Sequence, residues 1–172
     1  MKLYKTLAIL ICSFTVIYLC ASCQRDDLCA EDTPTTPFLI IKFIDDETVS
    51  DIKRPVDLEV KTTDPEITRS VPDVSSRDSI LIPLRTGAQL TEFEFIINSS
   101  SQNTELVNSD IVSFQYTPVE EYVSSACGFR VTYSGLTQTL TQEENNGNWI
   151  KRIRIEEDNV TDETAAHVLI FH

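Results

Sequence analysis

Hydrophobic and polar positions alternate along most of this chain with the period of two that β-strands show. Residues 38–44 are apolar on both alternating faces, which predicts a central strand. Val56, Leu58 and Val60 alternate with charged residues, which predicts a strand with one solvent-exposed face. Further inward-facing sets are Ile80, Ile82 and Leu84; Phe93, Phe95 and Ile97; Val112, Phe114 and Tyr116; Phe129, Val131 and Tyr133; Trp149, Ile153 and Ile155; and Val168 and Ile170 opposite Leu169 and Phe171.

Turn signals separate these segments, and the strongest is Asn146-Gly147, a dipeptide that supplies the positive φ angles of a tight hairpin. No window of a dozen residues carries a helical apolar stripe. The pattern therefore predicts an all-β protein, a single antiparallel β-sandwich of about seven to eight strands with an immunoglobulin-like topology as one candidate. An open barrel is the main alternative.

The N-terminus differs from the rest of the chain. Lys2 and Lys5 precede an apolar run from Leu7 to Leu19, which fits the charged and hydrophobic regions of a secretory signal peptide. The run is shorter than the roughly 20 residues that a spanning helix needs, although an uncleaved membrane helix is the alternative. Cys20-Ala21-Ser22-Cys23 follows and resembles the lipobox of bacterial lipoproteins.

In lipoproteins the peptide is cut before the lipobox cysteine, which receives a diacylglycerol by thioether and a further acyl chain. That implies a signal peptide over residues 1–22, lipidation of Cys23, a tether over residues 23–36 and a sandwich domain over residues 37–172. Cys20 departs from the family, which most often has leucine there. Gln24 favours the outer membrane over inner-membrane retention, and the domain would face the periplasm or the cell surface.

Charge excludes nucleic acid as a partner. Removing residues 1–22 deletes two lysines and no acids, so the mature chain carries 12 basic and 27 acidic side chains and a net charge of −15. Such a surface repels phosphates. Lys151, Arg152 and Arg154 form the one basic group, on what we expect to be the solvent-exposed face of a strand.

Maturation leaves Cys29 and Cys127 as the only pair besides the lipidated Cys23. In an oxidising compartment the pair can close a disulfide that spans 98 positions. Two free buried thiols, or a metal site built on two cysteines, are the alternatives.

Catalytic chemistry has little to build on, with four glycines and two histidines in the whole chain. His167 and His172 lie five residues apart on the last strand, so alternation sends them to opposite faces, and we expect a structural role for His167. We therefore predict no catalytic residue, no metal site and no cofactor.

Two alternatives use the acidic residues. A glycan hydrolase would need two of the paired carboxylates to face each other across a cleft. A calcium-stabilised adhesion module would use loops such as Asp45 to Glu47 or Glu156 to Asp162, although neither has the spacing of an EF-hand. The carboxylate pairs are Asp45-Asp46-Glu47, Glu120-Glu121, Glu143-Glu144 and Glu156-Glu157-Asp158.

Trp149, Tyr122 and Tyr133 could form a platform on which sugars stack, but for Trp149 we expect core packing, because the residue opens a strand directly after a turn.

The segment 122–130, in which Cys127-Gly128 enters an alternating strand, is the most distinctive in the chain. With Asp27-Leu28-Cys29, Trp149-Ile150-Lys151 and the closing Ala166-His167-Val168, it resembles a family of uncharacterised outer-membrane lipoproteins of Bacteroidetes. The resemblance runs from the lipobox to the end of the chain. It supports a disulfide between Cys29 and Cys127, and it implies an envelope location beside an outer-membrane β-barrel protein.

Together these observations predict a non-enzymatic envelope lipoprotein. Cys23 would anchor it to membrane lipid, and its sandwich would bind or support another envelope component or an extracellular ligand.

Overall fold

The computed structural model describes residues 28–63, 77–143 and 147–172. The predicted signal peptide, Cys23 and the first part of the tether lie outside the described residues. The described residues form two compact units: a smaller one containing residues 28–33 together with Val123–Gly128, and a larger one within Pro34–Tyr122 and Phe129–His172.

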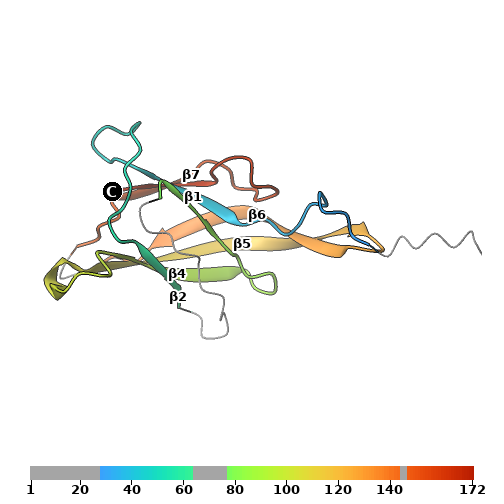
Figure 1. Ribbon diagram of the computed structural model, residues 1–172, viewed down its shortest axis with the longest axis horizontal. Coiled ribbons are helices and arrows are strands. Elements are labelled where there is room, and N and C mark those ends of the chain that lie inside the picture. Colours follow the sequence, from blue (N-terminus) through green and yellow to red (C-terminus); the bar gives the residue numbers. More distant parts are fainter. Residues whose placement is uncertain (1–27, 64–76, 144–146) are drawn as a thin grey trace, which may run out of the picture. The chain divides into compact units, whose positions relative to one another are not determined.

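The larger unit is a β-sandwich, which confirms the predicted fold class. One sheet has the strand order β3-β1-β8-β7 and the other has the order β2-β4-β5-β6 (Figure 1). The eight strands are β1 Leu39–Ile44, β2 Glu59–Thr62, β3 Ser79–Ile82, β4 Leu90–Ile97, β5 Asn108–Ser124, β6 Gly128–Leu140, β7 Arg152–Ile155 and β8 Val168–Phe171. A 3₁₀ helix, η1, covers Thr104–Leu106 between β4 and β5. The last residues of β5 and the first residue of β6 belong to the smaller unit.

Strand β1 lies inside its sheet, as its two-sided apolar pattern predicts. It pairs antiparallel with β3 and parallel with β8, so that Ile41 is opposite Ile80 on one side and Val168 on the other. The residues of β1 that face the other sheet, Leu39, Ile41 and Phe43, are fully buried, whereas Ile40 and Lys42 on the opposite face are half-buried. The first and last strands of the described residues, β1 and β8, are thus neighbours in the middle of one sheet.

The core lies between the two sheets and is rich in aromatic rings. Phe93 of β4 makes edge-to-face contacts with Phe95 and with Phe114 of β5, each with ring centroids 6.4 Å apart. Edge-to-face geometry places the positive edge of one ring against the negative face of the next. All three rings are at most 1% exposed.

Two buried tyrosines hold the segment after β3. The Tyr133 hydroxyl donates to the Leu84 carbonyl at 3.1 Å, and the Tyr116 hydroxyl donates to the Arg85 carbonyl at 3.0 Å. Their rings meet edge to face with centroids 5.0 Å apart. Burial raises the pKa of Tyr133 to about 12, so its hydroxyl stays protonated and able to donate.

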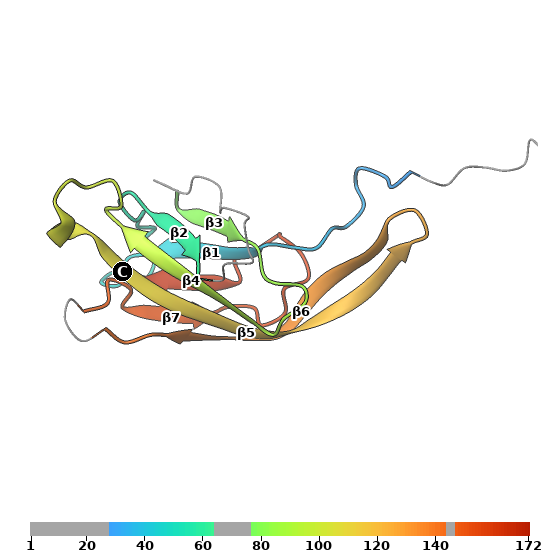
Figure 2. The same ribbon diagram turned by 90° about the horizontal axis from the view of Figure 1, so that it is seen from below.

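Two predicted inward positions are wrong. Val56 is 63% exposed because β2 begins only at Glu59, after Asp57 takes a positive φ of 44°. Phe129 is 67% exposed although it has the same alternation phase as the buried Tyr133. Val131, between them, packs only partly against the core, so the covering sheet ends before Phe129. In Figure 2, β5 and β6 run on together beyond the ends of β2 and β4.

The predicted hairpin at Asn146-Gly147 is also wrong, because β6 and β7 belong to different sheets. Gly147 does take a positive φ of 67°, and Asn146 lies outside the described residues. The fully buried Asp110 of β5 fixes this crossing segment. One of its carboxylate oxygens accepts the Ile150 N–H at 2.7 Å and the other accepts the Asn148 side-chain amide at 2.8 Å.

We expect Asp110→Ala to lower the free energy of unfolding by about 2–5 kcal/mol, because it leaves the buried Ile150 N–H and one hydrogen of the partly buried Asn148 amide without their acceptor. Burial raises the pKa of Asp110, and the two hydrogen bonds oppose that rise. Urea unfolding measures the change. Glu120→Ala, at an exposed position of the same strand, is the control and should stay within about 0.5 kcal/mol of the natural protein. Equal losses in the two variants would contradict the role of Asp110.

Candidate functional site

The smaller unit is built around a disulfide. Cys29 and Cys127 are bonded with an S–S distance of 2.08 Å and Cα atoms 4.9 Å apart. Cys127 lies in the turn between β5 and β6, where its N–H donates to the Ser124 hydroxyl at 3.0 Å. The bond therefore ties the chain, six residues after Cys23, to the end of the β5–β6 hairpin.

The acidic group of the β1–β2 loop caps a turn. One carboxylate oxygen of Asp45 accepts the N–H groups of Glu47 and Thr48 at 2.7 and 3.2 Å. The other oxygen lies 3.4 Å from the Lys53 ammonium. The backbone hydrogen bonds, with a smaller contribution from Lys53, hold the pKa of Asp45 below its ordinary value.

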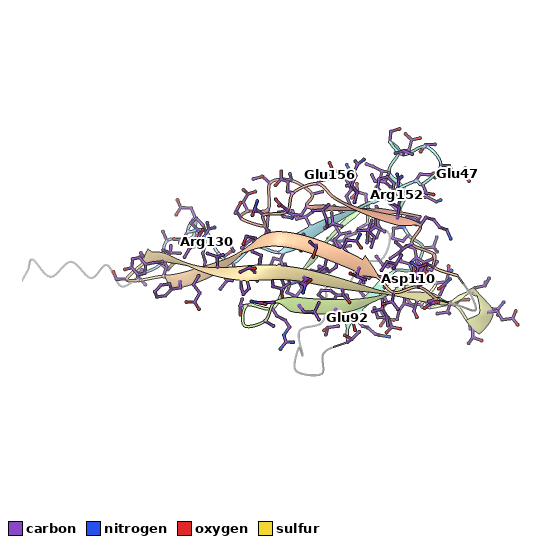
Figure 3. The ribbon with its side chains drawn as sticks, turned by 180° about the vertical axis from the view of Figure 1, so that it is seen from behind. Glu47, Glu92, Asp110, Arg130, Arg152 and Glu156 are labelled. Carbon is purple, nitrogen blue, oxygen red and sulfur yellow. A yellow bond between two sulfur atoms is a disulfide. The ribbon has the colours of Figure 1, made fainter. Side chains whose placement is uncertain are left out.

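Members of three other predicted acidic pairs also have basic partners, and Figure 3 labels Arg130, Arg152 and Glu156 among the residues involved. Asp46 lies 3.5 Å from Arg152, Glu121 lies 2.7 Å from Arg130, and Glu156 pairs with Arg154. Among the residues that the structure describes, no group of three or more His, Cys, Asp or Glu side chains could hold a metal ion. These acids work in turns and ion pairs, and their geometry lends no support to the hydrolase or the calcium hypothesis.

The two histidines have separate surroundings. His167 precedes β8, is 1% exposed, and accepts the Ile40 N–H on Nδ1 at 3.1 Å. The backbone N–H of His167 donates to the Ile40 carbonyl at 3.0 Å, so this residue continues the pairing of β1 with β8. His172 instead lies edge-to-face against Phe43 and Trp149. Accepting a hydrogen bond on Nδ1 requires a neutral ring, which agrees with the structural role predicted for His167.

We expect His167 to make the protein less stable in mild acid. Burial lowers its pKa, and the nearby Glu157, Asp162 and Glu163 only partly offset that effect. Its stabilising contribution is therefore complete above the unfolded value near 6.5 and is lost as the pH falls through that value toward the folded pKa.

Urea unfolding at pH 7.5 and pH 5.5 tests this expectation. The natural protein should lose more unfolding free energy between the two pH values than His167→Gln, whose side chain does not titrate. Since His172 also has a lowered pKa and is present in both proteins, its effect cancels in the comparison. The same loss in both proteins would show that His167 is not responsible.

The aromatic candidates separate into buried and exposed residues. Trp149 is 6% exposed and its indole N–H donates to the Phe95 carbonyl at 3.0 Å, which confirms core packing. Tyr122 is 62% exposed and meets Phe129 edge to face with centroids 5.4 Å apart. The alternation pattern missed this exposed pair because it carries no information on where the opposite sheet ends.

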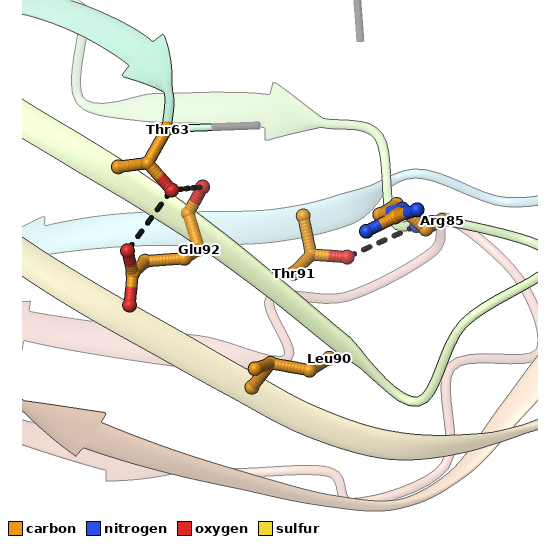
Figure 4. Close-up of a pocket in the computed structure, with 5 residues that line it drawn as sticks. All are labelled: Thr63, Arg85, Leu90, Thr91 and Glu92. Carbon is orange, nitrogen blue, oxygen red and sulfur yellow. Dashed lines mark hydrogen bonds between the residues drawn. The ribbon is translucent and has the colours of Figure 1, made fainter. Parts of the chain in front are cut away.

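A shallow depression of about 200 Å³ lies beside β4 (Figure 4). It is lined by Thr63, Arg85, Leu90, Thr91 and Glu92. Glu92 accepts from the hydroxyls of Thr63 and Ser113 at 2.9 and 2.8 Å, and Thr91 accepts the Arg85 N–H at 3.1 Å. Ligand sites usually enclose about 300–1,000 Å³, so this depression is small for an organic ligand.

The β1–β2 and β4–β5 loops form a second feature, which we call the loop surface. Val49, Asp57 and Asn98, all within these loops, are the non-glycine residues with positive φ in the described part of the chain. The Asn98 N–H donates to the Val56 carbonyl at 2.9 Å, and the Ser100 hydroxyl donates to the Asp57 carboxylate at 2.7 Å. Asp and Asn adopt positive φ readily, whereas for the β-branched Val49 this conformation is strained and persists only where the surroundings fix it.

The loop surface also carries exposed apolar side chains. Val56 is 63% exposed and Leu106 of η1 is 57% exposed. Asn98 joins the two segments, because its backbone N–H donates to the Val56 carbonyl and its side-chain amide donates to the Leu106 carbonyl at 2.8 Å. The arrangement holds apolar side chains in water on a fixed backbone, as a binding surface requires.

Comparison of the sequence with known protein families assigns the chain to a family. A family model matches residues 57–172, which is more than half of the chain. The chain belongs to the DUF6452 family. That family is described as one of unknown function, and no curated protein and no solved structure matches the chain. Strand β1 lies outside the matched residues although it sits between β3 and β8. No helix in the described ranges is long and apolar enough to cross a membrane.

Proposed function

We propose that this DUF6452 member is a non-enzymatic envelope lipoprotein, anchored to the outer membrane by acylation of Cys23. Its β-sandwich would bind or support another envelope component, with an outer-membrane β-barrel protein as the first candidate and an extracellular ligand as the second. The lipobox-like Cys20-Ala21-Ser22-Cys23 and the resemblance to uncharacterised Bacteroidetes lipoproteins are the sequence support for the anchor.

The observation that carries the proposal is the disulfide between Cys29 and Cys127. Disulfides persist in the periplasm and on cell surfaces and are rare in the reducing cytosol, so the bond agrees with export. Its position supports a tethered domain as well. The disulfide joins Cys29, six residues after the proposed anchor, to Cys127 in the turn between β5 and β6.

The loop surface is the best candidate for partner binding. It combines fixed backbone with the exposed Val56 and Leu106, whereas Asp45, Asp46, Glu121 and Glu156 are engaged in turns and ion pairs. Buried apolar contact is the main favourable term in most protein association. The charge of the mature chain points to a partner that is not itself strongly acidic.

A photo-crosslinking amino acid in place of Val56 tests the binding role in native envelopes. We expect a discrete adduct with an envelope protein, identified by mass spectrometry, because this side chain is exposed on the loop surface. The matched control places the same amino acid at Thr139, an exposed position of β6 outside the loop surface. Absence of an adduct at Val56, or equal adducts at both positions, would count against the loop surface.

Two cysteine variants test the lipid anchor in the same experiment. Cys23→Ser should release the protein from the membrane fraction and weaken the Val56 adduct, because acylation needs the thiol. Cys20→Leu gives the lipobox its most usual residue and should leave both readouts unchanged. Membrane retention of Cys23→Ser would contradict the lipid anchor.

A further inference from the structure

The exposed aromatic pair lies on the β5–β6 hairpin, with Tyr122 in β5 and Phe129 in β6. Tyr122 and Phe129 are 62% and 67% exposed, and their rings contact each other with an interplanar angle of 67°. The next residues along, Glu121 and Arg130, form an ion pair at 2.7 Å, and Arg130 also donates to the Thr161 carbonyl at 3.3 Å. The two rings are therefore presented to solvent from a braced end of the hairpin.

The chain that leads to the anchor is short. From Cys23 to Cys29 there are six residue steps, which span at most about 20 Å when fully extended. The disulfide adds 4.9 Å between Cα atoms, and Phe129 follows Cys127 by two residues, or at most about 7 Å. Without the disulfide, the next contact between the tether and the hairpin is at Thr36, whose hydroxyl accepts the Val131 N–H. The chain from Cys23 to Thr36 spans up to about 45 Å.

We propose that Tyr122 and Phe129 contact the lipid bilayer and orient the sandwich on the membrane. This inference rests on the proposed acylation of Cys23. Tyrosine and other amphipathic rings favour the headgroup region, where the ring is dry and the hydroxyl is wet. The lipid anchor and the disulfide keep the two rings close to the membrane surface. Even weak partitioning of the rings into the headgroup region is therefore enough to hold the sandwich in one orientation.

Local charge specifies the kind of lipid surface. Glu120 and Glu121 flank the pair on β5, and Arg130 offers one positive charge that Glu121 already engages. An acidic mature chain is repelled by anionic headgroups. The surface that fits is therefore a zwitterionic one, such as phosphatidylcholine.

Brominated lipid quenching of the full acylated protein tests the contact. Phe129→Trp places an indole at the pair, and Thr139→Trp places one at an exposed position ten residues further along β6. In brominated phosphatidylcholine vesicles we expect a roughly twofold fall in the emission of the first variant, since interfacial side chains sit about 5–10 Å into the headgroup boundary. The emission of the second variant should fall no more than that of the natural protein, whose only tryptophan, Trp149, is buried.

The outcomes separate this proposal from the anchor. Intact mass is measured on the same sample, so a chain without acyl groups defeats the anchor, whereas an acylated protein with no quenching at Phe129→Trp overturns the bilayer contact. Tyr122→Trp repeats the test from the other ring if Phe129→Trp changes the melting temperature. Quenching that grows when phosphatidylglycerol is added would also overturn the proposal, because the contact would then be electrostatic.

Discussion

The parallel pairing of β1 with β8 is the constraint on which the sandwich depends. Hydrogen bonds in register from Ile41 opposite Val168 to Ile44 opposite Phe171 join the start of the domain to its end. With β3 on the other side of β1, this pairing makes one continuous sheet, and that sheet covers the aromatic face of β4 and β5. His167 extends the same contact through its bonds to both backbone groups of Ile40. Without β1, strand β3 would have no partner and β8 would have one unpaired edge. The family match nevertheless begins at residue 57, after β1.

Sequence patterns predicted much of this fold and failed where tertiary context decides. The two-sided apolar run of residues 38–44 predicted a central strand, and β1 does lie inside its sheet, with one face fully buried and the other half-buried. Strand order was beyond such patterns, since they do not report which edges meet. The prediction of a hairpin at Asn146-Gly147 failed for this reason, because the dipeptide permits a tight turn whereas Asp110 holds the following residues on a path to the other sheet.

The candidate sites divide in the same way. Spacing predicted a structural His167 and a packed Trp149, because both follow from local alternation and composition. The exposed Tyr122–Phe129 contact and the joined Asp57 and Asn98 loops could not be predicted from sequence patterns, since each brings together residues on different strands or loops. Exposed apolar side chains on the hairpin and on the loop surface give the sandwich two separate faces on which binding can be tested. One is proposed for lipid and the other for a protein partner.

The central proposal is that acylation of Cys23 anchors the protein to the membrane and that the Cys29–Cys127 disulfide forms in the exported chain. The most direct test is the intact mass of the protein extracted from native membranes, with thiols alkylated before and after reduction. The account predicts a chain that begins at Cys23 and carries acyl groups, with two alkylatable thiols that appear only after reduction. A chain that begins at Met1, or one without acyl groups and with Cys29 and Cys127 free, would contradict it.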